Sequence, residues 1–427
     1  MLSAAPLGEK TLYESSSLCL SSPFFTYFAM SNVVATITHG LFWSVATVAC
    51  AAVYTVTMVP FVWRTRKLGV GLFEKKDRSA LYPKLFTEDG EFGRHRYIDL
   101  GGGKKFHVVE SGNTNGPLVL FLHGFPQCWY TWSKQLKGLK GDQYHLVAMD
   151  MRGYGASYRP KRTGFVMKEF ISDVRGLIEA LQKDKPQESR RVTLVSHDWG
   201  AIVGWHVMAD SWKLEASQQG YIDKGIIINI GHPLVSTGNL LQPFQKYLSW
   251  HWLIQLITKP TVTWPIIKTG FAPVLTQLSK SYYIYIFQLP TSFGRSFLSI
   301  RDWFFAELVV KGIKNSTAED AEIYKAAAAY ATVDDPTPAI DYAIEYYRRG
   351  AALEGWSLKN KADGVIGIPV LVLWGEQDVA LDMKINLENT KSRVPNVEIQ
   401  TYPGVGHFLP EEIPDELNEK IRKFASK

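Results

Sequence analysis

The residue best suited to covalent chemistry is Asp198, at the centre of the pentapeptide Ser-His-Asp-Trp-Gly that spans residues 196–200. A β-branched run, residues 191–195, precedes it, and a helix-like segment follows from Ala201. Small residues at both ends with a reactive residue in the middle are typical of a strained turn from a strand into a helix. Such a turn lifts one side chain above a sheet. The spacing therefore predicts that Asp198 is presented as a nucleophile.

A carboxylate at this position changes which substrates are accessible. A serine that attacks an alkyl carbon forms an ether, which has no easy route back to the free enzyme. A carboxylate forms an ester instead, and water can hydrolyse that ester at the enzyme's own carbonyl carbon. Asp198 therefore indicates displacement at carbon, either by opening an epoxide or by expelling a halide.

The groups needed for ester hydrolysis follow later in the chain. His407 lies in the Gly-rich loop 404–408, where it is placed to activate water as a general base. The apolar run 368–374 predicts a strand, and Asp378 lies just beyond it, with Glu376 close by. We expect Asp378 to orient His407 and to stabilise its charged form. The chain order is then nucleophile, acid and histidine.

Two backbone N–H groups are expected to stabilise the oxyanion of ester hydrolysis. The apolar run 117–122 predicts a buried strand, and residues 123–126, His-Gly-Phe-Pro, follow it directly. A loop at that place lies beside the predicted turn and can offer an N–H group to the oxyanion. We assign these donors to Phe125 and to Trp199, the residue after the nucleophile.

Five motifs together resemble the epoxide hydrolase family of the α/β-hydrolase superfamily, in particular the membrane-anchored members related to soluble epoxide hydrolase. The motifs occur in the family's order and cover roughly residues 91 to 427. One segment departs from the pattern: after the sixth strand the family tends to have Asn-x-Pro-His, whereas this chain has Asn-Ile-Gly-His-Pro at 229–233. The motifs are residues 123–126, 150–157, 196–200, 374–378 and 406–408.

The resemblance implies two tyrosine phenols from a lid, which bind the epoxide oxygen and help to protonate it. One family tyrosine precedes a Phe-Gln-x-Pro sequence, present here at 287–290, and this gives Tyr283. The second precedes an arginine late in the lid, and Tyr347 fits that position best. A phenol suits this role because it stays protonated at neutral pH and donates strongly. Tyr282 and Tyr285 are the neighbours that an error of register would substitute for Tyr283.

Strand-like runs alternate with helical segments, which predicts an α/β fold of the α/β-hydrolase type with a mostly parallel eight-stranded sheet. The long interval between the sixth and seventh strands has helical spacing and many aromatic residues, so we expect an inserted helical cap. The predicted strands lie at 97–100, 106–109, 118–122, 145–149, 192–195, 226–230, 370–374 and 397–402. The predicted parts are an N-terminal region (1–90), a first part of the core (91–232), the cap (233–356) and a second part of the core (357–427).

The N-terminal region is expected to carry a membrane anchor. Residues 41–63 contain no charged side chain and, as a helix, would span roughly 34 Å, enough to cross a bilayer. Arg64, Arg66 and Lys67 follow at once, and the bias of positive charge predicts a cytosolic catalytic domain. We therefore expect a single-pass protein, with the endoplasmic reticulum as its membrane. Residues 18–34 are also apolar, but serines and Pro23 interrupt them.

Other features exclude several function classes. Cys128 is the only cysteine beyond the N-terminal region, so no disulfide framework is possible there. The chain has no metal-ligand cluster with plausible spacing and no Gly-rich phosphate loop, so we expect no metal and no cofactor. The net charge of +6 is explained by residues beside the anchor rather than by a surface for nucleic acid.

The sequence thus favours hydrolysis of a small apolar epoxide, a lipid epoxide among the candidates, to a vicinal diol. The aromatic segment 250–254 and the expected anchor both favour an apolar substrate. Two alternatives stay open. A haloalkane or fluoroacetate dehalogenase shares the Asp, His and acid but needs a halide cradle, to which Trp199 could contribute a donor. A membrane-tethered relative that only binds ligand is the other.

Overall fold

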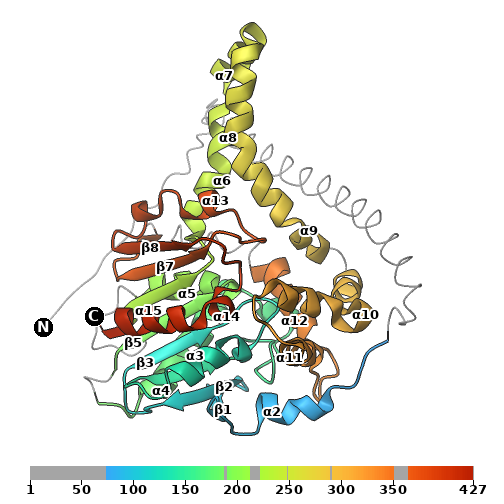
Figure 1. The fold of residues 1–427 in the computed structure, drawn as a ribbon, viewed down its shortest axis with the longest axis vertical. Coiled ribbons are helices and arrows are strands. Elements are labelled where there is room, and N and C mark those ends of the chain that lie inside the picture. The colour runs from blue at the N-terminus through green and yellow to red at the C-terminus, as the bar shows by residue number, and fades with distance from the viewer. Residues whose placement is uncertain are drawn as a thin grey trace, which may run out of the picture. The chain divides into compact units, whose positions relative to one another are not determined.

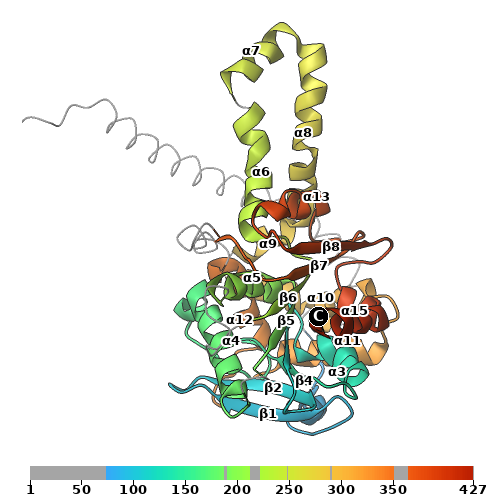
Figure 2. The ribbon, with the colours of Figure 1, turned by 90° about the vertical axis from the view of Figure 1, so that its left-hand side faces the viewer.

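The computed structural model describes residues 74–186, 190–211, 222–247, 249–288, 291–350 and 364–426. An eight-stranded sheet with the strand order β1-β2-β4-β3-β5-β6-β7-β8 forms its centre (Figures 1 and 2). The strands are β1 (Arg94–Asp99), β2 (Lys105–Gly112), β3 (Leu118–Leu122), β4 (His145–Met149), β5 (Val192–His197), β6 (Lys224–Ile228), β7 (Val370–Gly375) and β8 (Val397–Tyr402).

The sheet is mostly parallel. Strand β2 pairs antiparallel with both β1 and β4, and every other pairing is parallel. Strands β3 to β7 are buried along their whole length. Parallel strands covered on both faces read as continuous apolar runs, which is why these segments were recognisable in the sequence.

Helices cover both faces of the sheet. Helices α3 (Ser133–Gly138) and α15 (Pro414–Ser426) lie on one face, and α4 (Met167–Gln182) and α5 (Trp199–Ser211) lie on the other (Figure 2). Helix α5 is buried over nearly all of its length. Because α5 begins at the residue after Asp198, its burial fixes the position of the nucleophile relative to the sheet.

A helical segment separates β6 from β7 in the chain. Helices α9 to α12 lie together beside the sheet, whereas α6 and α8 run side by side away from it, with α7 at their far end (Figures 1 and 2). The helices are α6 (Pro233–Tyr247), α7 (Trp250–Thr258), α8 (Pro260–Lys280), α9 (Tyr282–Gln288), α10 (Thr291–Gly312), α11 (Ala318–Ala329) and α12 (Ala339–Glu345). Shorter helices are α2 (Tyr82–Phe86), α13 (Met383–Leu387) and α14 (Leu409–Glu412).

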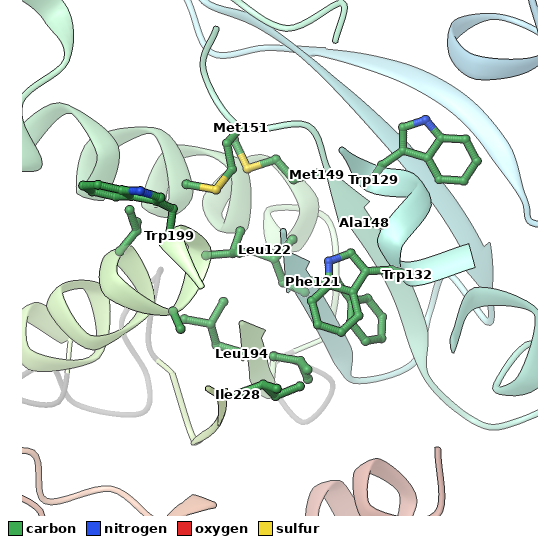
Figure 3. Close-up of a cluster of buried hydrophobic side chains, with 14 of the residues drawn as sticks. Phe121, Leu122, Trp129, Trp132, Ala148, Met149, Met151, Leu194, Trp199 and Ile228 are labelled. Atoms are coloured by element: carbon green, nitrogen blue, oxygen red, sulfur yellow. The ribbon is translucent and has the colours of Figure 1, made fainter. Parts of the chain in front are cut away.

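The apolar core lies against the central strands. Figure 3 shows Leu122, Leu194 and Ile228, from neighbouring strands, gathered in one cluster with Trp199. All four side chains are at most 2% exposed. The residue that follows the nucleophile is therefore part of the packed core, which makes the turn at Asp198 rigid.

The α/β-hydrolase fold with a mostly parallel eight-stranded sheet is confirmed. The sixth strand was predicted at 226–230, but β6 spans 224–228, because Asn229 leaves the strand with a φ of 55°. The division of the chain into four parts stays a prediction. The predicted membrane span at 41–63 lies outside the described residues. None of the helices within those residues combines the length and the apolar character needed to cross a bilayer.

Candidate active site

Asp198 occupies a strained turn between β5 and α5. Its backbone has a φ of 50°, which is rare for a residue other than glycine, and its side chain is buried. The turn requires close approach of neighbouring backbone. A Cβ at Gly124 would lie 2.4 Å from the Cβ of Asp198, and one at Gly200 would lie 2.4 Å from the carbonyl oxygen of Leu122. Glycine at both positions therefore makes this geometry possible.

The predicted oxyanion donors flank the Asp198 carboxylate. The Phe125 backbone N–H donates to Asp198 Oδ1 at 2.7 Å. Trp199 is the first residue of α5, and N–H groups in the first turn of a helix have no carbonyl partner within that helix. The Phe125 N–H thus contacts the Asp198 carboxylate, whereas the role of the Trp199 N–H stays a prediction.

A chain of hydrogen bonds links the histidine to both carboxylates. His407 Nε2 lies 3.4 Å from Asp198 Oδ2, and His407 Nδ1 lies 2.8 Å from Asp378 Oδ2. All three residues are at most 6% exposed. One imidazole nitrogen is held by Asp378, and the other faces the nucleophile, as water activation requires.

Three further groups hold Asp378. The side-chain amide of Asn229 donates to Asp378 Oδ2 at 2.7 Å. The backbone N–H groups of Ala380 and Leu381 donate to Asp378 Oδ1 at 2.7 and 2.9 Å. By contrast, Glu376 is exposed and accepts a hydrogen bond from the Thr401 hydroxyl. Asp378, not Glu376, is therefore the acid that contacts the histidine.

Sequence reasoning did not identify Asn229 as part of the site. The residue belongs to the segment 229–233, where the chain departs from the family pattern. The signal was available: a buried polar residue at the C-terminal end of a parallel strand lies at the edge where the other site residues gather.

The charges of the triad strongly perturb its pKa values. Burial by itself would lower the pKa of His407, but the charge of Asp378 and the hydrogen bond to Asp198 overcome it and raise the pKa to about 10. Burial opposes ionisation of both carboxyls as well, yet the neighbouring imidazolium lowers the pKa of Asp198 and that of Asp378. The resting site thus holds one imidazolium between two carboxylates.

Tyr283 and Tyr347 come together in the cavity that Asp198 also lines. Their ring centroids are 5.9 Å apart at an interplanar angle of 84°. The Tyr347 ring also packs edge-on against Phe125 at 5.0 Å and against Trp199 at 5.1 Å. Burial and the negative charge of Asp198 raise the pKa of Tyr283, and burial raises that of Tyr347. Both phenols are therefore protonated and can donate.

The neighbouring tyrosines differ from this pair. The hydroxyl of Tyr346 donates to the Arg152 carbonyl oxygen at 2.8 Å and is buried away from the cavity. Tyr282 lies at the rim and is 50% exposed. The geometry therefore favours Tyr283 over Tyr282, and Tyr347 over Tyr346.

A mostly apolar cavity of about 300 Å³ opens above Asp198. Its volume is at the lower end of the range for small-molecule sites. Most of its lining surface is apolar, so a substrate would be held chiefly by apolar contact. The lining includes Asp198, His407, Tyr283, Tyr347, Phe125, Pro126, Phe305, Val309, Val379 and Phe408.

Nearby polar residues have structural partners. His197 Nε2 lies 2.8 Å from the His407 carbonyl oxygen, and His123 Nε2 accepts a hydrogen bond from the Met151 N–H. Asp150 is fully buried and accepts from the Trp129 N–H at 2.8 Å. Within the described residues, no cluster of three or more His, Cys, Asp or Glu side chains is arranged to hold a metal ion.

Comparison with known proteins agrees with this architecture. Residues 119–420 match the alpha/beta hydrolase family. Epoxide hydrolase 4 of Homo sapiens is 28% identical over 92% of this chain and 96% of its own length. Epoxide hydrolase 1 of Caenorhabditis elegans is 29% identical over 84% of this chain and 75% of its own length.

A solved structure of an epoxide hydrolase has a similar fold. An epoxide hydrolase from Bacillus megaterium, 26% identical, superposes with a TM-score of 0.57 over 78% of this chain and all of its own. The chain therefore belongs to the alpha/beta hydrolase family and, within that superfamily, to the epoxide hydrolases.

Proposed function

We propose that this protein is an epoxide hydrolase that forms a covalent ester on Asp198. The observation that carries the proposal is the open apolar cavity, where a triad of Asp198, His407 and Asp378 faces a pair of tyrosine phenols. A carboxylate and a proton donor on opposite sides of one cavity are the two groups that epoxide opening needs. The family relatives support this activity.

In the first half-reaction the Asp198 carboxylate attacks an epoxide carbon and the C–O bond of the ring breaks. The ring oxygen leaves as an alkoxide, which takes a proton from Tyr283 or Tyr347. The products are a hydroxyalkyl ester of Asp198 and one tyrosinate. The proton held by His407 then restores that phenol, directly or through water.

Ester formation itself prepares the base. In the resting site two carboxylates keep the pKa of His407 at about 10, so the imidazole is protonated and cannot accept a proton from water. Alkylation removes the negative charge of Asp198, and the pKa of His407 falls because one of its two anionic neighbours is lost. His407 thus becomes a base only after the ester exists.

In the second half-reaction His407 removes a proton from water, and the hydroxide attacks the ester carbonyl carbon. The Phe125 and Trp199 N–H groups stabilise the tetrahedral oxyanion. Collapse breaks the bond to the alkyl oxygen, and that oxygen takes the proton of the newly formed carboxylic acid. A vicinal diol leaves, and Asp198 and the imidazolium return to their resting forms.

The cavity favours an apolar epoxide as substrate. Its walls are aromatic and aliphatic, and Phe305, Val309 and Phe408 present no charge to a ligand. A fatty epoxide is one such compound. A crystal structure of a related Bacillus megaterium enzyme, 26% identical, contains a naphthyloxy-propanediol product, which is likewise a diol on an apolar group.

A single turnover in ¹⁸O-labelled water tests the ester route. Excess enzyme is mixed with one epoxide, and the peptide that carries Asp198 is analysed by mass spectrometry. We expect the label in the Asp198 carboxylate, because the attacking water oxygen stays with the enzyme when the diol leaves. Label found only in the diol would mean direct attack by water and would refute the proposal.

The dehalogenase alternative is tested with the same preparation. A chloroalkane replaces the epoxide, and halide release is measured. The two phenols provide proton donors for an alkoxide, which halide expulsion does not need. We therefore expect a diol from the epoxide and no halide from the chloroalkane, and halide release without diol formation would favour a dehalogenase.

We also propose that residues 41–63 anchor the protein in the endoplasmic reticulum membrane, with its catalytic domain in the cytosol. The support is the charge-free stretch followed by Arg64, Arg66 and Lys67. Protease treatment of intact microsomes should digest the catalytic domain. Protection of that domain would contradict the orientation.

A further inference from the structure

Helices α6, α7 and α8 form an arm, residues 233–280, with an unusual surface. Among the described residues, eight of the thirteen large hydrophobic side chains that are exposed lie in it. Large apolar side chains exposed together, rather than singly, mark an interaction site. They are Leu241, Phe244, Ile254, Ile257, Val262, Trp264, Ile266 and Leu275.

The most exposed of these residues gather at the far end of the arm. Ile257 is 80% exposed at the end of α7, and Val262 and Trp264 are 62% and 57% exposed in the first turns of α8. Both views show the junction of α7 and α8 as the part of the arm farthest from the sheet (Figures 1 and 2). Within the part of the chain that the structure describes, the apolar end therefore lies away from the apolar core.

The charge of the arm has a single sign. No Asp or Glu occurs between residues 233 and 288, although the whole chain has 41 acidic residues against 47 basic ones. Lys246, Lys259 and Lys268 are exposed along the arm. Lys280 differs, because its ammonium donates to the carbonyl oxygens of Asp378 and Leu381. Lys259 and Lys268 thus accompany the apolar end with no acidic residue in the arm itself, whereas Lys246 lies nearer the base, in a hollow that Glu388 also lines.

We propose that the arm docks into the surface of an anionic lipid bilayer. Tryptophan and aliphatic side chains beside lysines are the combination that binds the boundary between headgroups and acyl chains. The apolar end would enter this boundary while the lysines meet anionic headgroups. The proposal is for docking at the interface, because none of the described helices is long and apolar enough to cross a bilayer, and α8 contains Pro265 and Pro273.

The arm leads to the catalytic cavity. Helix α8 ends at Lys280, and Lys280 and Tyr282 both line the cavity that contains Asp198. Docking would bring the cavity's rim towards the membrane, where apolar compounds concentrate. The docking itself depends only on the surface of the arm and holds whether or not the proposed reaction is correct.

Photo-cross-linking tests the docking in the full chain. The photoreactive residue p-benzoyl-phenylalanine replaces Ile257, and in a matched control it replaces Val333, which is fully exposed in the turn between α11 and α12. Each protein is reconstituted in phosphatidylcholine vesicles containing phosphatidylserine, irradiated and analysed by mass spectrometry. We expect lipid adducts at position 257 and none at 333.

A charge-reversal variant tests the electrostatic part. Lys259→Glu and Lys268→Glu are combined in the chain that carries the probe at 257. The yield of lipid adducts should fall by about fivefold for each lysine, because each contributes about 1 kcal/mol near an anionic surface. The fall should disappear in vesicles of phosphatidylcholine alone.

Three results would overturn the proposal. Equal adduct yields at 257 and 333 would show that the arm has no preference for lipid. A covalent dimer formed through position 257 would assign the surface to a second copy of this chain. Adducts between position 257 and residues 1–73 would assign it to the chain's own N-terminal region.

Discussion

At the scale of single residues, the order of the two chemical steps follows from charge. A base held between two carboxylates is protonated, and the same base beside one carboxylate and one ester is far less so. The site therefore does not activate water before a substrate is bound. This arrangement avoids a conflict in which His407 would have to be a cation for Asp198 and a base for water at the same moment.

The two half-reactions should consequently differ in pH dependence. Alkylation needs an ionised Asp198, whose pKa is lowered, so its rate should be constant through the neutral range. Ester hydrolysis needs neutral His407, so its rate should rise with pH until the imidazole of the ester form is deprotonated. Stopped-flow measurement of both phases over a pH series checks this expectation.

Asp378→Asn provides the matched variant for that experiment. Removing the second carboxylate lowers the pKa of His407 by about one to three units, the effect of one opposite charge at close range. The hydrolysis profile should therefore shift to lower pH, while its maximum rate falls because His407 is less well oriented. An unshifted profile would mean that the charge of Asp378 does not control the base.

The tyrosine pair is tested by removing one hydroxyl at a time. Tyr283→Phe and Tyr347→Phe should each slow alkylation by about tenfold to a hundredfold, because a hydrogen bond to a charged group is worth about 1.5–3 kcal/mol. Ester hydrolysis should hardly change. Tyr346→Phe is the control, since its hydroxyl binds the Arg152 carbonyl oxygen and does not face the cavity. A slower alkylation step in Tyr346→Phe would contradict the assignment of Tyr283 and Tyr347 as the proton donors.

At the scale of elements, the site depends on how closely two turns approach each other. The loop after β3 and the turn after β5 touch at Gly124 and Asp198. This contact allows the Phe125 N–H to reach the carboxylate.

Gly124→Ala should therefore disable the enzyme without unfolding it. The new methyl group would meet the Asp198 side chain, and displacing the nucleophile by about 1 Å costs on the order of a hundredfold in rate. Gly141→Ala is the control, because a Cβ there has no neighbour within 4 Å. Turnover and circular dichroism of both variants check the result, and near-normal activity of Gly124→Ala would contradict it.

The same elements explain what the sequence could predict. Strands β3 to β7 were recognisable because burial on both faces demands unbroken apolar runs. The turn at Asp198 was recognisable because it requires small residues on both sides of a reactive residue, directly between a strand and a helix. The position of Asn229 at the end of a parallel strand was a usable signal, but its partner was not predictable, since the hydrogen bond to Asp378 joins positions 149 residues apart through the pairing of β6 with β7. The arm was missed for another reason: helical spacing predicts an apolar face but does not tell what covers it.

At the scale of the whole molecule, a buried carboxyl connects the helices between β6 and β7 to the loop after β3. Glu411 on α14 accepts a hydrogen bond from the Tyr324 hydroxyl of α11 at 2.6 Å and another from the Gln127 amide, in the loop after β3. Burial raises the pKa of Glu411 to about 8, although these two donors act in the opposite direction. The folded protein therefore keeps this carboxyl protonated at neutral pH.

This protonation makes stability depend on pH in a defined direction. The carboxyl has a pKa near 4.5 when unfolded and about 8 when folded, so between these values the folded state holds a proton that the unfolded state has released. The free energy of unfolding therefore decreases as pH rises through this window, by up to about 1.4 kcal/mol per pH unit.

Glu411→Gln should remove this dependence, because glutamine stays neutral and imitates the protonated acid in shape. The variant should match the wild type near the acidic end of the window and exceed its stability by a few kcal/mol at the alkaline end, at about 1.4 kcal/mol per pKa unit. Glu419→Gln, which removes an exposed carboxyl of α15, controls for the change in net charge. Thermal unfolding of the full chain in detergent over a pH series distinguishes them. If Glu411→Gln and the wild type instead lose stability in parallel, the Glu411 carboxyl is ionised in the folded state. The contact between α11 and the loop after β3 would then be made by a charge rather than by a neutral hydrogen-bonded acid.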